Sequence, residues 1–199
     1  YTTLFRSKGE LHKTYLMIYR NAQRILRLIN QLMDIRKLDK GQMFMKFQET
    51  DMIGFIIDVM QPFEYMAHKK NIDFAFIHDM PQLKAWIDLN NFDKVLMNVL
   101  SNAFKYTPEG GKVVLVIDET SENVMFSVED NGIGLDEAKI PLIFQRFYRI
   151  NQASTVVGSG LGLSIVKQIV DSHQANIKVY RNNVAGGLAV RIEFSKGEI

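Results

Sequence analysis

An amphipathic repeat runs through the N-terminal part of the chain. Between Leu11 and Lys40 there is no glycine or proline, and apolar residues recur at alternating intervals of four and three positions. The spacing predicts one long helix whose apolar seam suits a coiled coil or a helical bundle. Packing of this seam on the helix's own domain is the alternative to self-association. Gly41 then fits the position just after a helix C-cap. The seam consists of Leu11, Tyr15, Ile18, Ala22, Ile25, Ile29 and Leu32.

Beyond Gly41 the pattern changes to a mixture of short strands and helices. Alternating apolar residues from Met43 to Phe47 predict a short strand. Thr50 or Asp51 can cap a helix that runs to about Lys70. The residues of this helix that are expected to point inward are Ile53, Ile56, Ile57 and Met60.

The rest of the chain alternates between helical segments and pairs of strands. Helices interleaved with antiparallel pairs imply an α+β fold, a two-layer α/β sandwich with a mixed sheet and its helices on one face. We therefore expect two domains, a helix at 1–41 and an α/β domain at 42–199. The predicted strands are 72–78, 84–87, 112–119, 123–129, 176–181 and 187–195, and the remaining predicted helices are 88–106 and 161–173.

Composition narrows the class of protein without naming a function. The chain has 199 residues, of which 47% are hydrophobic and 23% charged, enough for one domain with a core and an appendage. A net charge of +2 without a basic cluster argues against nucleic acid as a partner, and the lack of cysteine excludes disulfides and thiolate metal sites. No apolar run approaches the ~20 residues that span a bilayer. Because the chain does not begin with methionine, we expect it to be a fragment of a longer protein.

Three polar side chains share one face of the predicted helix at 88–106. Asn98, Asn102 and Lys105 follow each other at intervals of four and three residues, which stacks them along the helix. Two carboxamides and an ammonium can hold a hydrated Mg²⁺ ion and phosphate oxygens, because this hard cation keeps most of its waters. A solvated helix face is the alternative explanation of the same pattern.

Two glycine-rich segments add candidate ligand contacts. Asp130 follows directly on a predicted strand and is itself followed by Gly132 and Gly134, so the backbone can approach a flat ligand while the carboxylate accepts a hydrogen bond from an amine. Residues 158–163, Gly-Ser-Gly-Leu-Gly-Leu, open the last predicted helix, where free amides and the helix dipole favour an anion. Each segment alone is also compatible with a tight loop or a flexible linker.

Taken together, the order and spacing of these motifs resemble the nucleotide-binding domain of sensor histidine kinases. This domain belongs to the GHKL superfamily, with DNA gyrase, MutL and the heat-shock chaperone ATPases, and implies the Bergerat-type ATP-binding fold. The resemblance covers roughly 43–195, and the N-terminal helix resembles the second helix of the family's dimerisation and phosphotransfer hairpin. The matching segments are 98–107 (N box), 130–134 (G1 box), 143–149 (F box) and 158–163 (G2 box), with an ATP lid at about 150–157.

The resemblance implies a role for each matching residue. Asp130 would accept a hydrogen bond from the adenine amine, and Asn102, helped by Asn98, would hold Mg²⁺ against the triphosphate. Lys105 would contact phosphate. Tyr106 would lie against the base, and Tyr148 and Arg149 would reach the ribose or phosphate side. The other residues implied at the ATP site are Gly132, Gly134, Gly158, Ser159, Gly160, Leu161 and Gly162.

The resemblance also implies partners and a cellular setting. We expect ATP and Mg²⁺ as cofactors, a homodimer formed through the hairpin helices, and a response-regulator receiver domain that takes the phosphoryl group. The parent is expected to be an inner-membrane sensor whose cytoplasmic portion contains this chain. The phosphoacceptor is expected on an upstream helix, because His12 is followed by Lys-Thr-Tyr and not by an acid and a proline. The chain alone should therefore not phosphorylate itself.

Two positions bear on the alternatives to a kinase. Asn98 stands where hydrolytic members of the superfamily carry a glutamate base, and a carboxamide cannot take a proton from water. This disfavours an ATPase of the chaperone or topoisomerase kind. Leu188 stands where many relatives carry Ser or Thr, so a hydroxyl or water partner of Asp130 is expected to be lost. Because of that difference, a third alternative is a domain that retains the fold and serves only as an interaction module.

Overall fold

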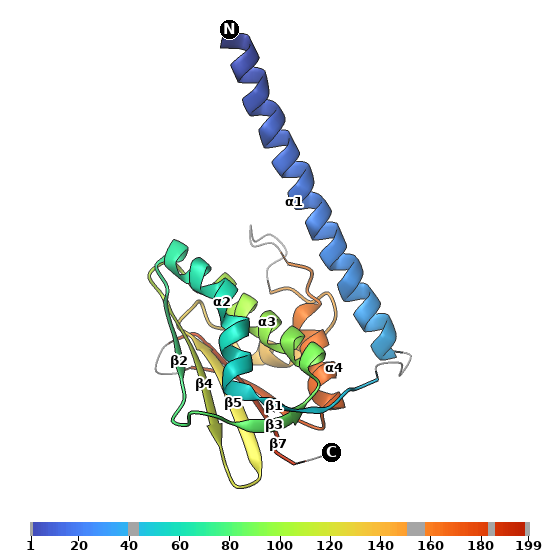
Figure 1. Cartoon of the computed structure of the whole chain (residues 1–199), viewed down its shortest axis with the longest axis vertical. Coiled ribbons are helices and arrows are strands. Elements are labelled where there is room, and N and C mark those ends of the chain that lie inside the picture. Colours follow the sequence, from blue (N-terminus) through green and yellow to red (C-terminus); the bar gives the residue numbers. More distant parts are fainter. Residues whose placement is uncertain (1, 40–43, 151–157, 183–185, 198–199) are drawn as a thin grey trace. The chain divides into compact units, whose positions relative to one another are not determined.

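The computed structural model describes residues 2–39, 44–150, 158–182 and 186–197. It divides into two compact units, Tyr1–Met43 and Phe44–Ile199. The first is a single helix, α1 (Thr2–Asp39), which confirms the predicted helix and extends it toward the N-terminus (Figure 1). Its apolar seam is open, with Leu11 72% and Leu32 46% exposed. The domain boundary after Gly41 stays a prediction, since residues 40–43 lie outside the described part.

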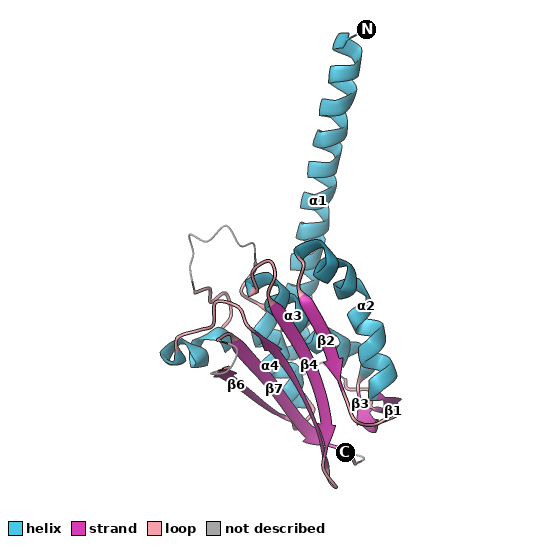
Figure 2. Cartoon of the chain, turned by 90° about the vertical axis from the view of Figure 1, so that its left-hand side faces the viewer, coloured by secondary structure: helices cyan, strands magenta, loops and turns pink. Residues whose placement is uncertain are grey.

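The second unit is built on a five-stranded mixed sheet with its helices on one face (Figures 1 and 2). The sheet order is β2-β4-β5-β7-β6, in which β2 and β4 are parallel and the other neighbours antiparallel. A small antiparallel pair, β1 with β3, lies outside it. The predicted two-layer fold is therefore confirmed. Its strands are β1 (Gln48–Asp51), β2 (Asp73–Ile77), β3 (Lys84–Ile87), β4 (Lys112–Glu119), β5 (Asn123–Asp130), β6 (Asn176–Arg181) and β7 (Leu188–Ser195), and its helices are α2 (Met52–Lys70), α3 (Leu89–Tyr106), the 3₁₀ helix η1 (Glu137–Phe144) and α4 (Gly162–Ser172).

Helix α3 lies at the centre of the core because its sequence is apolar on one face and polar on the other. Asp88 caps its start by accepting a hydrogen bond from the amide of Asn91 at 3.0 Å. The ring of Phe92 packs edge-on against Phe126 of β5 and Phe194 of β7, with centroids 5.4 and 5.3 Å away. The polar face is thereby left on the side away from the sheet. The buried apolar residues of α3 are Phe92, Val95, Leu96, Val99, Leu100, Ala103 and Phe104.

Two predictions about the start of this unit are wrong. The strand expected from Met43 to Phe47 is not present in its described part, since residues 44–47 form no regular structure and β1 begins at Gln48. On α2, Ile57 is 47% exposed, although Ile53, Ile56 and Met60 are buried as predicted. Across the described residues, no helix combines the length and the hydropathy that crossing a membrane requires.

Candidate functional site

The carboxylate of Asp130 lies at the end of β5, half-buried beside the start of β7. Its Oδ1 accepts hydrogen bonds from the amide of Gly132 at 2.8 Å and from the amide of Leu188 at 3.4 Å. Burial raises the pKa of this carboxyl above the ordinary aspartate value, and the two amide hydrogen bonds act in the opposite direction. Leu188 lacks the hydroxyl expected from the family pattern, but its backbone amide still contacts the carboxylate.

The backbone of β7 presses directly on Asp130. A Cβ atom on Gly187 would lie 2.1 Å from the carbonyl oxygen of Asp130 and 2.4 Å from its Oδ1. No side chain fits there, so glycine is required for the carboxylate to keep its position. The sequence prediction missed this role. The signal for it in the sequence is the pair Gly186-Gly187 at the start of the last predicted strand.

The polar face of α3 meets the glycine-rich segment that leads into α4. Asn98, Asn102, Lys105 and Tyr106 are all half-buried on this part of the helix. The side-chain Oδ1 of Asn98 is 2.6 Å from where a Cβ on Gly162 would lie, while its Nδ2 donates to the backbone carbonyl of Lys94 at 2.7 Å.

Lys105 marks a second contact between these two segments. Its ammonium lies 4.8 Å from the ring centroid of Tyr106 and 2.6 Å from where a Cβ on Gly158 would lie. The predicted N and G2 segments are therefore side by side in space.

The loop after Asp130 is joined to the end of α3. The amide of Ile133 donates to the carbonyl of Tyr106 at 3.4 Å, and a Cβ on Gly132 would lie 2.5 Å from the same oxygen. Asn131 joins the loop to β4, because its Oδ1 accepts a hydrogen bond from the backbone amide of Lys112 at 2.6 Å. The G1 segment is thus held between α3 and β4.

The predicted F segment contacts the G2 segment through its backbone. Phe147 has a positive φ of 64° and donates its amide to the carbonyl of Gly160 at 2.9 Å. Gly160 itself has a φ of 73°, and a Cβ there would lie 2.7 Å from the carbonyl carbon of Phe147. Tyr148 and Arg149 follow directly and are half-buried. Of the predicted lid, residues 151–157 lie outside the described residues.

The start of α4 offers backbone amides to a ligand. Leu161, the N-cap residue, makes no side-chain cap hydrogen bond, and its own amide donates to Oγ of Ser159 at 3.3 Å. The first amides of a helix that lack a side-chain cap favour an anion, because they add to the positive end of the helix dipole. This arrangement can bind phosphate oxygens opposite Lys105.

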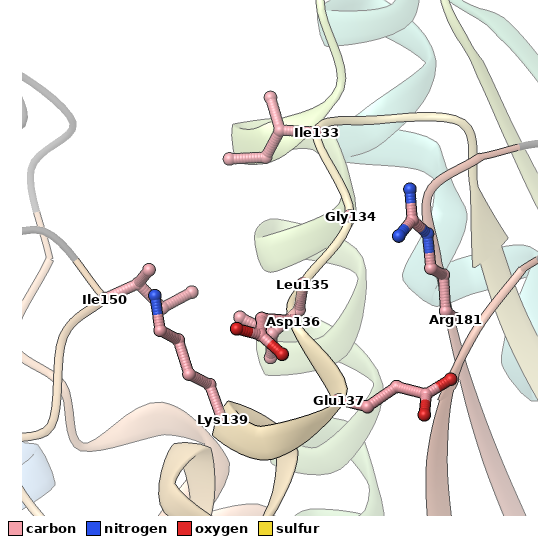
Figure 3. A pocket seen from close by; sticks show the side chains of 8 residues that line it. All are labelled: Ile133, Gly134, Leu135, Asp136, Glu137, Lys139, Ile150 and Arg181. Atoms are coloured by element: carbon pink, nitrogen blue, oxygen red, sulfur yellow. The ribbon is translucent and has the colours of Figure 1, made fainter.

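A cavity of about 480 Å³ lies next to these segments but is not centred on Asp130. Figure 3 shows Lys139 and Ile150 on one side of the segment that follows Gly134, and Arg181 on the other. Gly134 is the one predicted ATP-site residue in its lining, so this cavity adjoins the candidate site on the side where the lid begins. It is lined by Ile133, Gly134, Leu135, Asp136, Glu137, Lys139, Ile150 and Arg181.

Comparison with known proteins identifies the family. Residues 87–198 match the family "Histidine kinase-, DNA gyrase B-, and HSP90-like ATPase", which is more than half of the chain. The sensor histidine kinase WalK of Bacillus subtilis is 35% identical over 170 residues, covering 82% of this chain and 27% of WalK. The chain spans only 11% to 38% of the length of the curated relatives it matches.

Solved structures agree with this relationship. The catalytic domain of histidine kinase ThkA is 31% identical with a TM-score of 0.69, and the match covers 76% of this chain and 99% of that domain. ThkA in complex with the response regulator TrrA matches 87% of this chain and 49% of that chain, with 26% identity and a TM-score of 0.70. Full-length ShkA in complex with AMPPNP matches 88% of this chain and 37% of its own, with 25% identity and a TM-score of 0.77. The chain therefore belongs to the histidine kinase-, DNA gyrase B- and HSP90-like ATPases, and it contains the ATP-binding catalytic domain of a sensor histidine kinase.

Proposed function

We propose that this domain binds Mg·ATP and transfers the γ-phosphoryl group to a histidine of the dimerisation hairpin, for relay to an aspartate of a response regulator. The observation that carries the proposal is the convergence of Asp130, the polar face of α3 and the uncapped start of α4 around one region. A carboxylate can accept a hydrogen bond from the adenine amine, and an amide-lined helix start can bind the phosphates.

Each site residue has a proposed role. The carboxylate of Asp130 accepts a hydrogen bond from the adenine amine, and Tyr106 lies against the base. Lys105 and the backbone of residues 158–162 bind the phosphates, with Gly158, Ser159, Gly160, Leu161 and Gly162 in contact. Gly132 and Gly134 let the loop approach the base. Tyr148 and Arg149 reach the ribose or phosphate side.

The donor atoms present suit a magnesium ion that is bound mainly by the nucleotide. Among the described residues there is no cluster of three His, Cys, Asp or Glu side chains that could hold a metal on its own. The carboxamide oxygens of Asn102 and Asn98 are neutral, hard donors on the phosphate side of α3, as Mg²⁺ requires when it keeps waters and phosphate oxygens as its other ligands. Bound there, the ion would offset the negative charge of the transferring group.

Transfer to histidine, and not to water, is supported by Asn98. Its amide nitrogen donates to the carbonyl of Lys94, so its oxygen is directed toward Gly162. An amide oxygen is not basic at neutral pH and cannot activate water. A neutral imidazole already has a free lone pair and needs no such base.

The acceptor is proposed to lie outside this chain. Of the four histidines, His173 is 2% exposed and both of its ring nitrogens are engaged by the backbone. The exposed His12 lies on α1 without the acid and proline that follow a phosphoacceptor in this family. Transfer depends on placing the nucleophile in line with the γ-phosphoryl group, so a histidine without that placement should react poorly.

Self-association and partner choice follow from the same assignment. The exposed seam of α1, which includes Ile18 (61%) and Ile25 (57%), fits a homodimer whose hairpin helices complete a bundle. ThkA binds its response regulator TrrA, and we propose a receiver domain as the partner here too. The parent is proposed to be an inner-membrane sensor with this chain in its cytoplasmic portion.

The test uses radiolabelled ATP with the 199-residue chain, with a longer chain that includes the whole hairpin, and with a mixture of the two. We expect acid-labile, alkali-stable label on a hairpin histidine only when the complete hairpin is present. The Asp130→Asn variant of the longer chain is the matched control and should take up little label. Label on His12 of the short chain would contradict the proposed acceptor, and brisk phosphate release without protein label would favour an ATPase.

A further inference from the structure

We propose that Lys70, at the end of α2, is a positioning residue for the nucleotide site. Its ammonium holds the last turn of α3 and, through that turn, the loop that orients the Asp130 carboxylate. The inference rests on the proposed function, because it takes Asp130 and Tyr106 as nucleotide contacts.

The last turn of α3 cannot complete its own hydrogen bonds. The carbonyl of Phe104 would normally accept the amide four residues later, but that residue is Pro108, which has no N–H. The ammonium of Lys70 donates to this carbonyl at 2.6 Å and to the carbonyl of Thr107 at 3.3 Å. Phe104 and Thr107 are both buried, at 0% and 2% exposure, so water cannot replace the lysine easily. A positive charge at this helix end is also favoured by the helix dipole.

The backbone of the same residue holds the next part of the turn. The carbonyl of Lys70 accepts the amide of Gly110 at 3.1 Å, and the amide of Asp73 donates to the carbonyl of Gly111 at 2.9 Å. The connection from α3 to β4 is therefore bound to the end of α2 through Gly110 and to the start of β2 through Gly111. A rigid attachment of this kind fixes where α3 ends.

The position of that last turn sets the loop at the adenine site. The carbonyl of Tyr106 lies in the turn that Lys70 binds, and it accepts the amide of Ile133 at 3.4 Å. The amide of Gly132, one residue earlier, donates to Oδ1 of Asp130 at 2.8 Å. A shift of the turn therefore moves the Asp130 carboxylate. The Lys70 ammonium donates to two backbone carbonyls, so it acts on the nucleotide through α3 and the loop.

The decisive comparison is Lys70→Met against Lys69→Met. Lys69 is the exposed neighbour, so its substitution removes the same charge from the same helix end without touching the turn. Calorimetric titration with Mg·ATP, well below the melting temperature, should show roughly 3- to 30-fold weaker binding for Lys70→Met. Lys69→Met should stay within about twofold of the unsubstituted chain, since exposed charges contribute little. Equal affinities in the two variants would overturn the inference.

Two further readouts separate positioning from general destabilisation. Hydrogen exchange at the Ile133 amide should accelerate in Lys70→Met, while exchange in the β4–β5 hairpin stays unchanged. Lys70→Arg, which keeps the charge and the donors, should recover most of the affinity. Weaker binding with unchanged exchange at Ile133, or an arginine variant as weak as the methionine variant, would contradict the route through α3. If the unsubstituted chain bound no ATP, the proposed function itself would be wrong. If Asp130→Asn weakened ATP binding and Lys70→Met did not, the proposed function would stand and only the role of Lys70 would be wrong.

Discussion

The backbone amide of Asp88, at the start of α3, donates a hydrogen bond to Nε2 of His173, at the end of α4, over 3.2 Å. Nε2 must therefore be unprotonated, and Nδ1 carries the hydrogen that it donates to the carbonyl of Ile169 at 2.9 Å. The ring packs edge-on against Phe47 and Phe92, with centroids 5.1 and 5.6 Å away. A neutral imidazole thus joins the two helices that carry the nucleotide motifs, at the end of each helix that lies opposite its motif.

Stability should therefore depend on pH through His173. Burial lowers the pKa of this ring below its ordinary value of 6.5, despite opposing effects of Ile169 and Asp88. Below pH 6.5 the unfolded chain binds a proton that the folded chain does not. The free energy of unfolding therefore decreases as the pH is lowered, by at most about 1.4 kcal/mol per pH unit. Denaturant unfolding between pH 7.5 and 5 measures this slope. A His173→Gln variant should show a shallower slope in the same window, and parallel curves would contradict the assignment.

Substituting Asp130 by asparagine should weaken ATP binding without unfolding the domain. The amide oxygen of asparagine can still accept from Gly132 and Leu188, but its NH₂ group replaces the oxygen proposed to face the adenine amine. Loss of a charged hydrogen bond corresponds to about 1.5–3 kcal/mol, or roughly 10- to 100-fold in affinity. Calorimetry with Mg·ATP gives the affinity.

The control for this prediction is the preceding residue of the same strand. Glu129 accepts hydrogen bonds from Ser127 and Asn182 and belongs to neither glycine-rich segment. Glu129→Gln should leave the affinity nearly unchanged. Unaltered binding by Asp130→Asn would instead move the adenine site elsewhere. Because the pKa of Asp130 is raised by burial, the unsubstituted chain should also lose affinity on acidification before an ordinary aspartate would.

Replacing Gly187 by alanine should disturb both stability and binding. The new Cβ atom would overlap the carbonyl oxygen and Oδ1 of Asp130, and separating β5 from β7 to relieve this costs about 1–3 kcal/mol. Thermal unfolding should show a melting temperature several degrees lower, and the ATP affinity should fall in the surviving folded protein. Gly197→Ala is the matched control, since its Cβ would meet only Ser195 Oγ at 3.7 Å. Similar melting temperatures for both variants would show that β5 and β7 can separate at little cost in free energy.

Phe147 is held in a backbone conformation that favours glycine. Its φ is 64° while its side chain is 64% exposed, so little packing compensates for the strain. Phe147→Gly should therefore be more stable than Phe147→Ala, by about 1 kcal/mol, since both remove the ring but only glycine relieves the backbone. Denaturant unfolding of the two variants gives this difference directly. Equal free energies of unfolding for the two variants would mean that a Cβ atom adds no backbone strain at this position.

The elements that sequence predicts well here have local causes. Helix α3 follows from the cap at Asp88 and a continuous apolar face, and the β4–β5 hairpin follows from two apolar runs joined at Thr120 and Asn123. The nucleotide motifs were also predictable as segments, because their residue types and order are characteristic. What the structure adds is their convergence, such as Asn98 against Gly162 and Lys105 against Gly158.

The errors come from contacts between distant parts of the chain. The alternation up to Phe47 predicts a strand, but Phe47 packs on His173, and the sulfur of Met45 accepts a hydrogen bond from the side-chain amide of Asn91 at 3.6 Å. The true strand, β1, is polar and has no strand signal of its own. Lys70 was missed for a similar reason, since its acceptor at Phe104 is a main-chain carbonyl 34 residues away. Sequence patterns carry no sign of such acceptors.

The neighbours β5 and β7 are far apart along the chain, because Asp130 and Leu188 are separated by 58 residues. Closing a loop of that length costs about 2 kcal/mol more entropy than closing the short β4–β5 turn. We therefore expect the hairpin to form early in folding and the β5–β7 pair late. The candidate nucleotide site at Asp130 would then be absent from the folding transition state, so a bound nucleotide should slow the unfolding of the finished domain and leave its folding rate unchanged.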